Sequence, residues 1–196
     1  MSALEKTDYT PGPQDFSPKT KPQILSMLDS TVLPVQVGNT QIIRCEVITV
    51  PQTRFIGKHY DGYPNWGDAW ANGWFEKIEE MGAQSPINDG SYCVLYGKDN
   101  HHWIGEFMEA GTPAPEGLDI VDIPTSQAVL FFIKGQQGEC YATAYNTDVI
   151  NGLIQQLGLP NPTDDRVLKA FERDNCPRFT DPDEQGNVIL DYIVFM

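Results

Sequence analysis

The sequence has few positive charges for its length. Lys and Arg total 13 against 27 Asp and Glu, so the formal net charge is −14. Nucleic acids owe most of their non-specific affinity to basic contacts, so this charge argues against direct nucleic-acid binding. It favours a cationic or neutral ligand. The same charge is also compatible with an ordinary acidic protein.

Long apolar runs and closely spaced cysteines are missing too. No stretch approaches the ~20 apolar residues that span a bilayer, and no membrane partner is expected. Met1 to Thr10 is polar and charged, which predicts no signal peptide. The scattered cysteines are Cys45, Cys93, Cys140 and Cys176. This spacing favours free thiols over disulfides and predicts a cytoplasmic protein.

The sequence also lacks the common motifs of hydrolases and nucleotide-binding proteins. It contains no phosphate-binding glycine loop, no GxSxG elbow and no HExxH. His101 and His102 are adjacent, so on a strand or turn they point in different directions and do not grip one metal ion. We interpret this pair as part of a solvated loop. A serine-type or zinc-type hydrolase is therefore disfavoured, and no metal or other cofactor is expected.

An internal repeat is the strongest positive signal. Trp66 to Gly82 reads as one amphipathic helix, because apolar residues recur every three or four positions. Its last turns, Ile78–Gly82, are matched 76 positions later by Ile154–Gly158. The preceding segment, Val47–Thr53, resembles Ile120–Ser126 at an offset of 73. Two matches in the same order predict one strand-helix unit used twice.

The repeat predicts an α+β fold of two strand-helix-strand-strand halves related by a pseudo-two-fold axis. We expect a mostly antiparallel sheet with two main helices, the second over Thr147–Leu157. A proline-containing, partly irregular leader is expected over residues 1–40. The ligand-binding domain then spans residues 41–196, with halves at about 41–110 and 118–196. Gly135 to Gly138 is expected to form a turn.

Four segments, in order, resemble the GyrI-like small-molecule-binding domain. They are Val47–Gly57, Ile123–Gly135, Phe171-Glu172-Arg173 and Asp191-Tyr192-Ile193. This domain is the effector-binding module of AraC-type and MerR-type bacterial regulators and also occurs as a standalone protein. The match departs at Asp174, where the family usually has an aromatic residue, and at Val194, where it often has proline.

The resemblance implies a ligand cleft between the halves, lined by aromatic side chains, with a buried acid near its centre. It implies a standalone sensor or sequestering protein for an aromatic or cationic compound. It also implies two alternatives. One is a hydrolase that opens strained cyclopropane rings with a glutamate-activated water. The other is a regulator that contacts another protein, as with DNA gyrase. A protein partner or homodimer stays open.

Glu172 is the first candidate for a functional residue. Apolar neighbours such as Leu168 and Phe171 predict that it is desolvated, which raises the pKa of a carboxyl group. It would pair with a ligand cation or, in an enzyme, act as the catalytic general acid or base. The alternative is a surface ion pair with Arg173 or Arg166.

The other candidates are aromatic or acidic. Asp191 and Glu106 lie in apolar strands, at places that we take as equivalent in the two halves, and could face the cleft or the solvent. The aromatic candidates are Tyr63, Trp66, Tyr96, Trp103, Tyr145, Phe171 and Tyr192. Aromatic faces attract cations and stack on planar ligands. Trp70 and Trp74 are expected to pack in the core.

Overall fold

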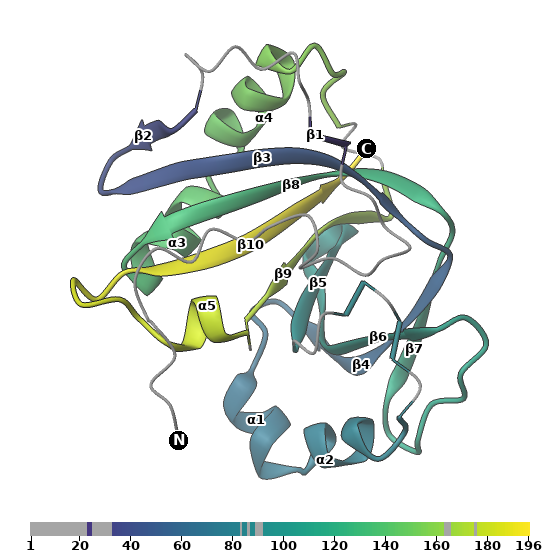
Figure 1. Cartoon of the computed structure of the whole chain (residues 1–196). Coiled ribbons are helices and arrows are strands. Elements are labelled where there is room, and N and C mark those ends of the chain that lie inside the picture. The colour runs from purple at the N-terminus through teal and green to yellow at the C-terminus, as the bar shows by residue number, and fades with distance from the viewer. Residues whose placement is uncertain are drawn as a thin grey trace.

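The computed structural model describes residues 23–24, 33–82, 84–85, 87–88, 92–162, 166–174 and 176–196. It is the predicted α+β fold, with all strand pairs antiparallel in one sheet (Figure 1). The strand order is β1-β3-β8-β10-β9-β5-β6-β4-β7, and β2 also pairs with β3.

In chain order, the described part of each half has two strands, two helices and two further strands, where the repeat predicted one strand, one helix and two strands. The strands are β1 (Gln23–Ile24), β2 (Val35–Val37), β3 (Thr40–Val50), β4 (Thr53–Asp61), β5 (Cys93–Gly97), β6 (His101–Glu109), β7 (Asp119–Ile123), β8 (Ser126–Gly135), β9 (Leu168–Arg173) and β10 (Val188–Phe195). The helices are α1 (Trp66–Ala71), α2 (Trp74–Glu79), α3 (Gln137–Ala144), α4 (Thr147–Gln156) and α5 (Pro177–Thr180), with a short 3₁₀ turn, η2 (Lys98–Asn100).

Two prolines mark a bend that curls the sheet. Pro51 separates β3 from β4, and Pro124 separates β7 from β8. Proline has no backbone N–H to donate to a neighbouring strand, so the hydrogen-bonded ladder is interrupted at each proline and resumes after it. β3 pairs with β8 and β4 pairs with β7 in one continuous register across the bend. Figure 1 shows both long strands turning together at this point.

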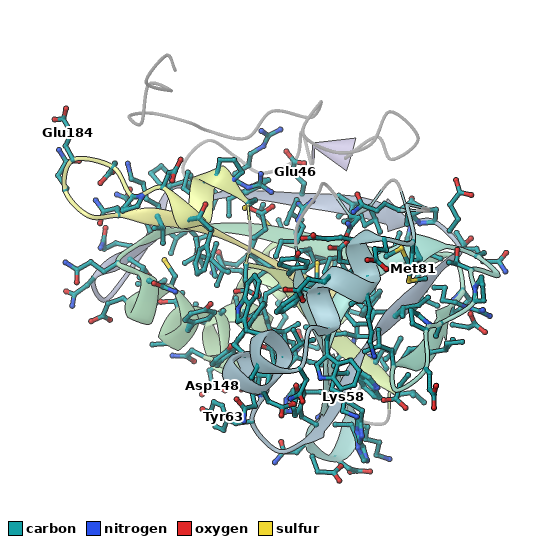
Figure 2. The ribbon with its side chains drawn as sticks, turned by 90° about the horizontal axis from the view of Figure 1, so that it is seen from below. Glu46, Lys58, Tyr63, Met81, Asp148 and Glu184 are labelled. Carbon is teal, nitrogen blue, oxygen red and sulfur yellow. The ribbon has the colours of Figure 1, made fainter. Side chains whose placement is uncertain are left out.

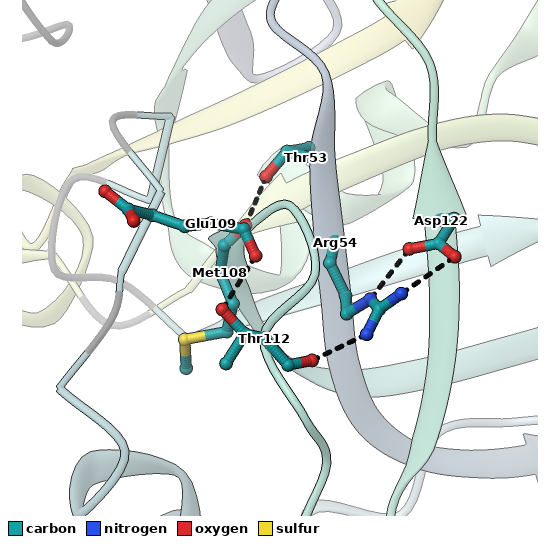
Figure 3. A network of polar contacts seen from close by, with 6 residues as sticks. All are labelled: Thr53, Arg54, Met108, Glu109, Thr112 and Asp122. Atoms are coloured by element: carbon teal, nitrogen blue, oxygen red, sulfur yellow. Dashed lines mark hydrogen bonds and ion pairs between the residues drawn. The ribbon is translucent and has the colours of Figure 1, made fainter.

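Polar contacts secure the chain just after the bend (Figure 3). Thr53 Oγ1 donates to the carbonyl oxygen of Met108 at 2.7 Å. The Arg54 guanidinium donates to both carboxylate oxygens of Asp122, at 2.7 and 3.0 Å, and to the Thr112 carbonyl oxygen at 2.7 Å. These contacts tie β4 to β6 on one side and to β7 on the other.

The pairing of residues between neighbouring strands locates the pseudo-two-fold axis. The cross-strand rows are Lys58–Ile104–Val94 in the first half and Phe131–Tyr192–Glu172 in the second. Lys58 and Phe131 are separated by the same 73 positions as the two bend prolines. The rows therefore correspond residue by residue, and Val94 matches Glu172. Because these two residues are also direct partners between β5 and β9, the axis passes between them.

The sheet has two buried faces, which we call the helical face and the inner face. On the helical face, α2 packs on β4 and β6, and α3 packs on β3, β8 and β10, with β5 and β9 running between. The inner face is lined by large apolar side chains, among them Phe55, Phe107 and Phe171. Side chains alternate between these faces along each strand.

A glycine pair brings β4 and β6 close together. Gly57 and Gly105 are partners in the ladder. A Cβ atom at Gly105 would lie 2.0 Å from the carbonyl oxygen of Ile56, nearer than any side-chain carbon can approach. Glycine is therefore required here for the backbones to approach.

The helices depart from the prediction in two places. The tryptophan stripe is divided into α1 and α2, because Gly73 adopts a left-handed conformation with φ of 66° between them. Trp70 is consequently half exposed, although its ring still contacts Phe75. The turn expected at 135–138 instead opens into α3. The predicted second helix is present as α4, capped by the Asn146 side chain.

Helices in the described part of the chain are too short or too polar to span a bilayer. All four cysteines are buried free thiols, in agreement with the predicted absence of disulfides.

Candidate functional site

A buried carboxylate lies at the pseudo-two-fold axis on the helical face. Glu172 lies on β9 and is only 2% exposed. Its Oε1 accepts a hydrogen bond from the Tyr96 hydroxyl at 2.6 Å, and both carboxylate oxygens lie 3.2 Å from the Tyr145 hydroxyl. The two hydroxyl oxygens are also 2.7 Å from each other. We call Glu172, Tyr96, Tyr145 and Tyr192 the Glu172 cluster.

Four elements from both halves build this cluster. Tyr96 comes from β5 in the first half, while Tyr145 follows the last turn of α3 in the second. Tyr192 is the β10 partner of Glu172, and its ring contacts that of Tyr145 with 6.5 Å between centroids. Tyr145 is 42% exposed, so the cluster reaches from the buried carboxylate to the protein surface.

A second acid lies beside the first. Asp174 is buried just beyond the end of β9, and its Oδ1 accepts a hydrogen bond from the Tyr141 hydroxyl at 2.7 Å. The Tyr141 ring stacks on Tyr145, with an interplanar angle of 24°. Two carboxyl groups therefore share one tyrosine-lined region.

Burial raises the pKa of Glu172 well above that of a free glutamate, and the nearby charge of Asp174 adds to this rise. Hydrogen bonds from Tyr96 and Tyr145 oppose it. Burial also raises the pKa of Asp174. The pKa values of both tyrosines are raised by burial and by the charge of Glu172, so their hydroxyls remain donors at neutral pH. The site can thus hold or release a proton when a charged group arrives.

Glu172 is not at the surface, and it does not form the alternative ion pair with Arg173. Glu172 is buried on the helical face, whereas its chain neighbour Arg173 points to the inner face. There Arg173 Nη2 lies 2.5 Å from Asp191 Oδ2.

Asp191 is not part of the Glu172 cluster. It lies fully buried on the inner face, next to Tyr192 in β10 but on the opposite side of the sheet. Arg178 Nε donates to its Oδ1 at 2.7 Å. Burial alone would raise the pKa of Asp191, but the Arg178 and Arg173 guanidiniums lower it below its usual range. This carboxylate is therefore an internal ion-pair partner.

The equivalence that we predicted between Glu106 and Asp191 is also wrong. Asp191 pairs with Phe132, which lies 73 positions after His59. His59 pairs with Trp103, so Trp103 is the counterpart of Asp191 in the first half.

Glu106 lies on the helical face but within the first half. Its Oε2 accepts from the side-chain amides of Gln84 and Asn88, at 2.7 and 2.8 Å. Burial and then the charge of Glu79 raise its pKa, while the amide hydrogen bonds oppose the rise. Its contacts are thus separate from those of Glu172.

The remaining aromatic candidates are dispersed. Trp103 and Phe171 lie on the inner face, away from the Glu172 cluster. Trp66, on α1, packs on the same apolar group as Tyr96 and is the nearer of the helix candidates. Tyr63 is 88% exposed and lies at the periphery of the molecule (Figure 2).

Sequence reasoning missed Tyr141 and Asp174. Tyr141 belongs to α3, whose start was interpreted as a turn, so its four-residue spacing from Tyr145 on a helix was not considered. Asp174 was noted only as a departure from a motif. Its position two residues after Glu172, on the same side of an extended chain, was the available signal.

Three solved structures are similar to this chain. A candidate bacterial transcription regulation protein from Staphylococcus aureus MU50 is 10% identical, with a TM-score of 0.53, covering 78% of this chain and 97% of that one. EcmrR, from an EcmrR–DNA complex, is 12% identical with a TM-score of 0.49, covering 81% of this chain and 57% of EcmrR. An integron cassette protein from the mobile metagenome of Vibrio cholerae is 13% identical with a TM-score of 0.40, covering 81% and 99%.

No protein-family model matches the sequence, and neither does any curated protein. The similarity to the S. aureus protein concerns the fold alone.

Proposed function

We propose that this chain binds a small organic cation with aromatic character at the Glu172 cluster, as a sensor or sequestering protein of the GyrI-like type. The observation that carries the proposal is a buried carboxylate whose hydrogen bonds come from two neutral tyrosine hydroxyls. A ligand cation beside Glu172 would favour the ionised form of its carboxyl group.

The tyrosine rings support a cationic ligand with a flat apolar body. Tyr145 is partly exposed and its ring contacts those of Tyr96, Tyr141 and Tyr192. Aromatic faces attract cations within about 6 Å of the ring centroid and gain more when water is excluded. The net charge of −14 adds a favourable long-range field for a cation.

The test is titration of the full chain with planar cationic dyes, ethidium first, followed by calorimetry and dye fluorescence. Saturable binding is expected, and Glu172→Gln should weaken it at least ~10-fold, as expected for loss of a desolvated charge partner. Glu106→Gln is the matched control, because it neutralises another buried glutamate of the same sheet face. Absence of dye binding, or equal losses in both variants, would refute the proposal.

A hydrolase is the second candidate, favoured by the raised pKa of Glu172. The carboxylate form of Glu172 would take a proton from water as the oxygen attacks one carbon of a strained cyclopropane ring, and the carboxyl group so formed would return that proton. The released pair of electrons is protonated at the other carbon, so the product is the substrate plus one water. Incubation with cyclopropane-bearing electrophiles and mass spectrometry tests this, and a gain of one water that persists in Glu172→Gln would exclude Glu172 as its catalyst.

A further inference from the structure

Three potential metal ligands meet at the ends of β4 and β6, away from the Glu172 cluster. His59 and Asp61 are two positions apart in β4, so their side chains share a face of the sheet. Asp61 is the cross-strand partner of His101, which brings the second histidine to the same face. All three ligand atoms lie within 4.8 Å of one another.

The separations match those around one small metal ion. His59 Nε2 lies 2.8 Å from His101 Nδ1, and Asp61 Oδ1 lies 3.1 Å from His101 Nδ1 and 3.6 Å from His59 Nε2. Ligands at ~2.0–2.1 Å in tetrahedral geometry are ~3.3 Å apart, so adjustments of a few tenths of an ångström suffice.

We propose that His59, Asp61 and His101 bind one divalent transition-metal ion, with Zn²⁺ as the reference ion. Imidazole nitrogen and carboxylate oxygen are ligands that Zn²⁺ accepts, and three protein ligands leave a position for water. The His59–His101 contact is a hydrogen bond in the metal-free protein, so one of its two nitrogens carries a proton. Both contact nitrogens must be free of protons to bind the ion, so in the metal-bound form each neutral ring carries its single proton on its other nitrogen.

The surroundings favour a cation and hold the rings in place. The His59 and His101 rings stack with 5.0 Å between centroids, and the Trp103 ring packs against His59 at 5.0 Å. The carboxylate of Asp119 accepts from the His59 backbone N–H at 3.3 Å, which brings a second negative charge to the strand. The two histidines are therefore already oriented before an ion arrives.

His102 supplies an internal control. It neighbours His101, but its side chain points to the helical face, where Nδ1 contacts the Gly62 carbonyl oxygen and the ring packs edge-on against Tyr96. These three are the only histidines of the sequence, and the four cysteines are buried. Measuring metal binding after substituting each histidine in turn therefore shows which histidines bind the ion.

The experiment uses the full chain without a histidine tag, stripped of metal with a chelator. Isothermal calorimetry with Zn²⁺ should give one ion per chain. His101→Gln and His59→Gln should each weaken binding at least ~10-fold, since even loss of an outer partner of a metal ligand costs that much. His102→Gln should bind as the parent protein does. Circular dichroism and thermal melts verify that all variants fold.

Spectroscopy with other ions identifies the ligands independently. Co²⁺ should give visible d–d bands that are lost in the His59→Gln/His101→Gln double variant. Cu²⁺ should bind more tightly than Zn²⁺, as nitrogen and oxygen sites generally do, and quench tryptophan fluorescence through neighbouring Trp103. The proposal is overturned if Zn²⁺ does not saturate, if the double variant binds as the parent does, or if His102→Gln causes the larger loss. None of these outcomes depends on the Glu172 cluster.

Discussion

Replacing Asp191 with asparagine tests how the inner face is held together. The carboxylate lies between two guanidiniums, with Arg178 Nε at 2.7 Å from Oδ1 and Arg173 Nη2 at 2.5 Å from Oδ2. Asparagine keeps the size of the side chain but removes its charge. Two cationic groups then remain close together in the interior without that carboxylate.

The expected cost follows from burial. All three side chains are at most 4% exposed, and removal of one partner from a buried ion pair typically costs about 3–5 kcal/mol. This is a large part of the roughly 5–15 kcal/mol by which domains are stable. Asp122→Asn is the matched control, because Arg54 Nε also donates to Asp122 Oδ1 at 2.7 Å but Asp122 is 67% exposed. Only a small loss is expected there, because solvent screens an exposed pair.

Urea unfolding at pH 7, followed by tryptophan fluorescence and circular dichroism, measures the free energy of unfolding of both variants. The folded pKa of Asp191 is lowered, so its stabilisation is present above the unfolded pKa of ~3.9 and is lost as pH falls through the folded pKa. The difference between wild type and Asp191→Asn should therefore shrink in acid. A cost at pH 7 no larger than that of Asp122→Asn would refute the reasoning.

Three further predictions concern single sites. Because the pKa of Glu172 is raised in the folded protein, the stability of the wild type falls as pH rises from the unfolded to the folded pKa, by up to ~1.4 kcal/mol per pH unit. Thermal melts at several pH values should show that Glu172→Gln removes this dependence. Gly105→Ala should cost about 1–3 kcal/mol in urea unfolding, because its Cβ meets the Ile56 carbonyl, whereas equal stability would contradict that close approach. Asn146→Ala should cost ~1 kcal/mol by removing the α4 cap, and an unchanged midpoint would contradict the capping role.

The sheet was predictable because its strands carry strong local signals. Strands β8 and β10 lie in segments rich in β-forming residues. The pseudo-two-fold symmetry was implied by the two sequence matches at nearly the same separation. The division of the first helix was not predictable from spacing alone. The stripe from Trp66 to Met81 is helical in period throughout, and only the left-handed Gly73 interrupts it. Helix α3 lacks a clear apolar stripe, so its glycine-containing start resembled a turn.

The candidate site was predictable only in part, because pairing decides which residues meet. Glu172, Tyr96 and Tyr192 come together through ladders between β5, β9 and β10, and Tyr145 joins them from the end of α3. Asp191 was not separable from them by sequence, since the face that a strand residue occupies depends on its partners. The His59–His101 contact spans 42 positions, so inspection of adjacent residues alone found only the pair at 101 and 102.

The position of the axis between Val94 and Glu172 has a consequence for ligand orientation. A dimer of two identical halves would present the same side chain twice at its axis, either two valines or two glutamates. Two facing carboxyl groups would compete for one proton, and any bound molecule would have two equivalent poses. Because both halves belong to one chain, valine and glutamate can face each other there. The axis itself therefore carries one acid, Glu172, and a molecule bound above it would meet a polar side chain on one side and an apolar one on the other, which gives it one preferred pose.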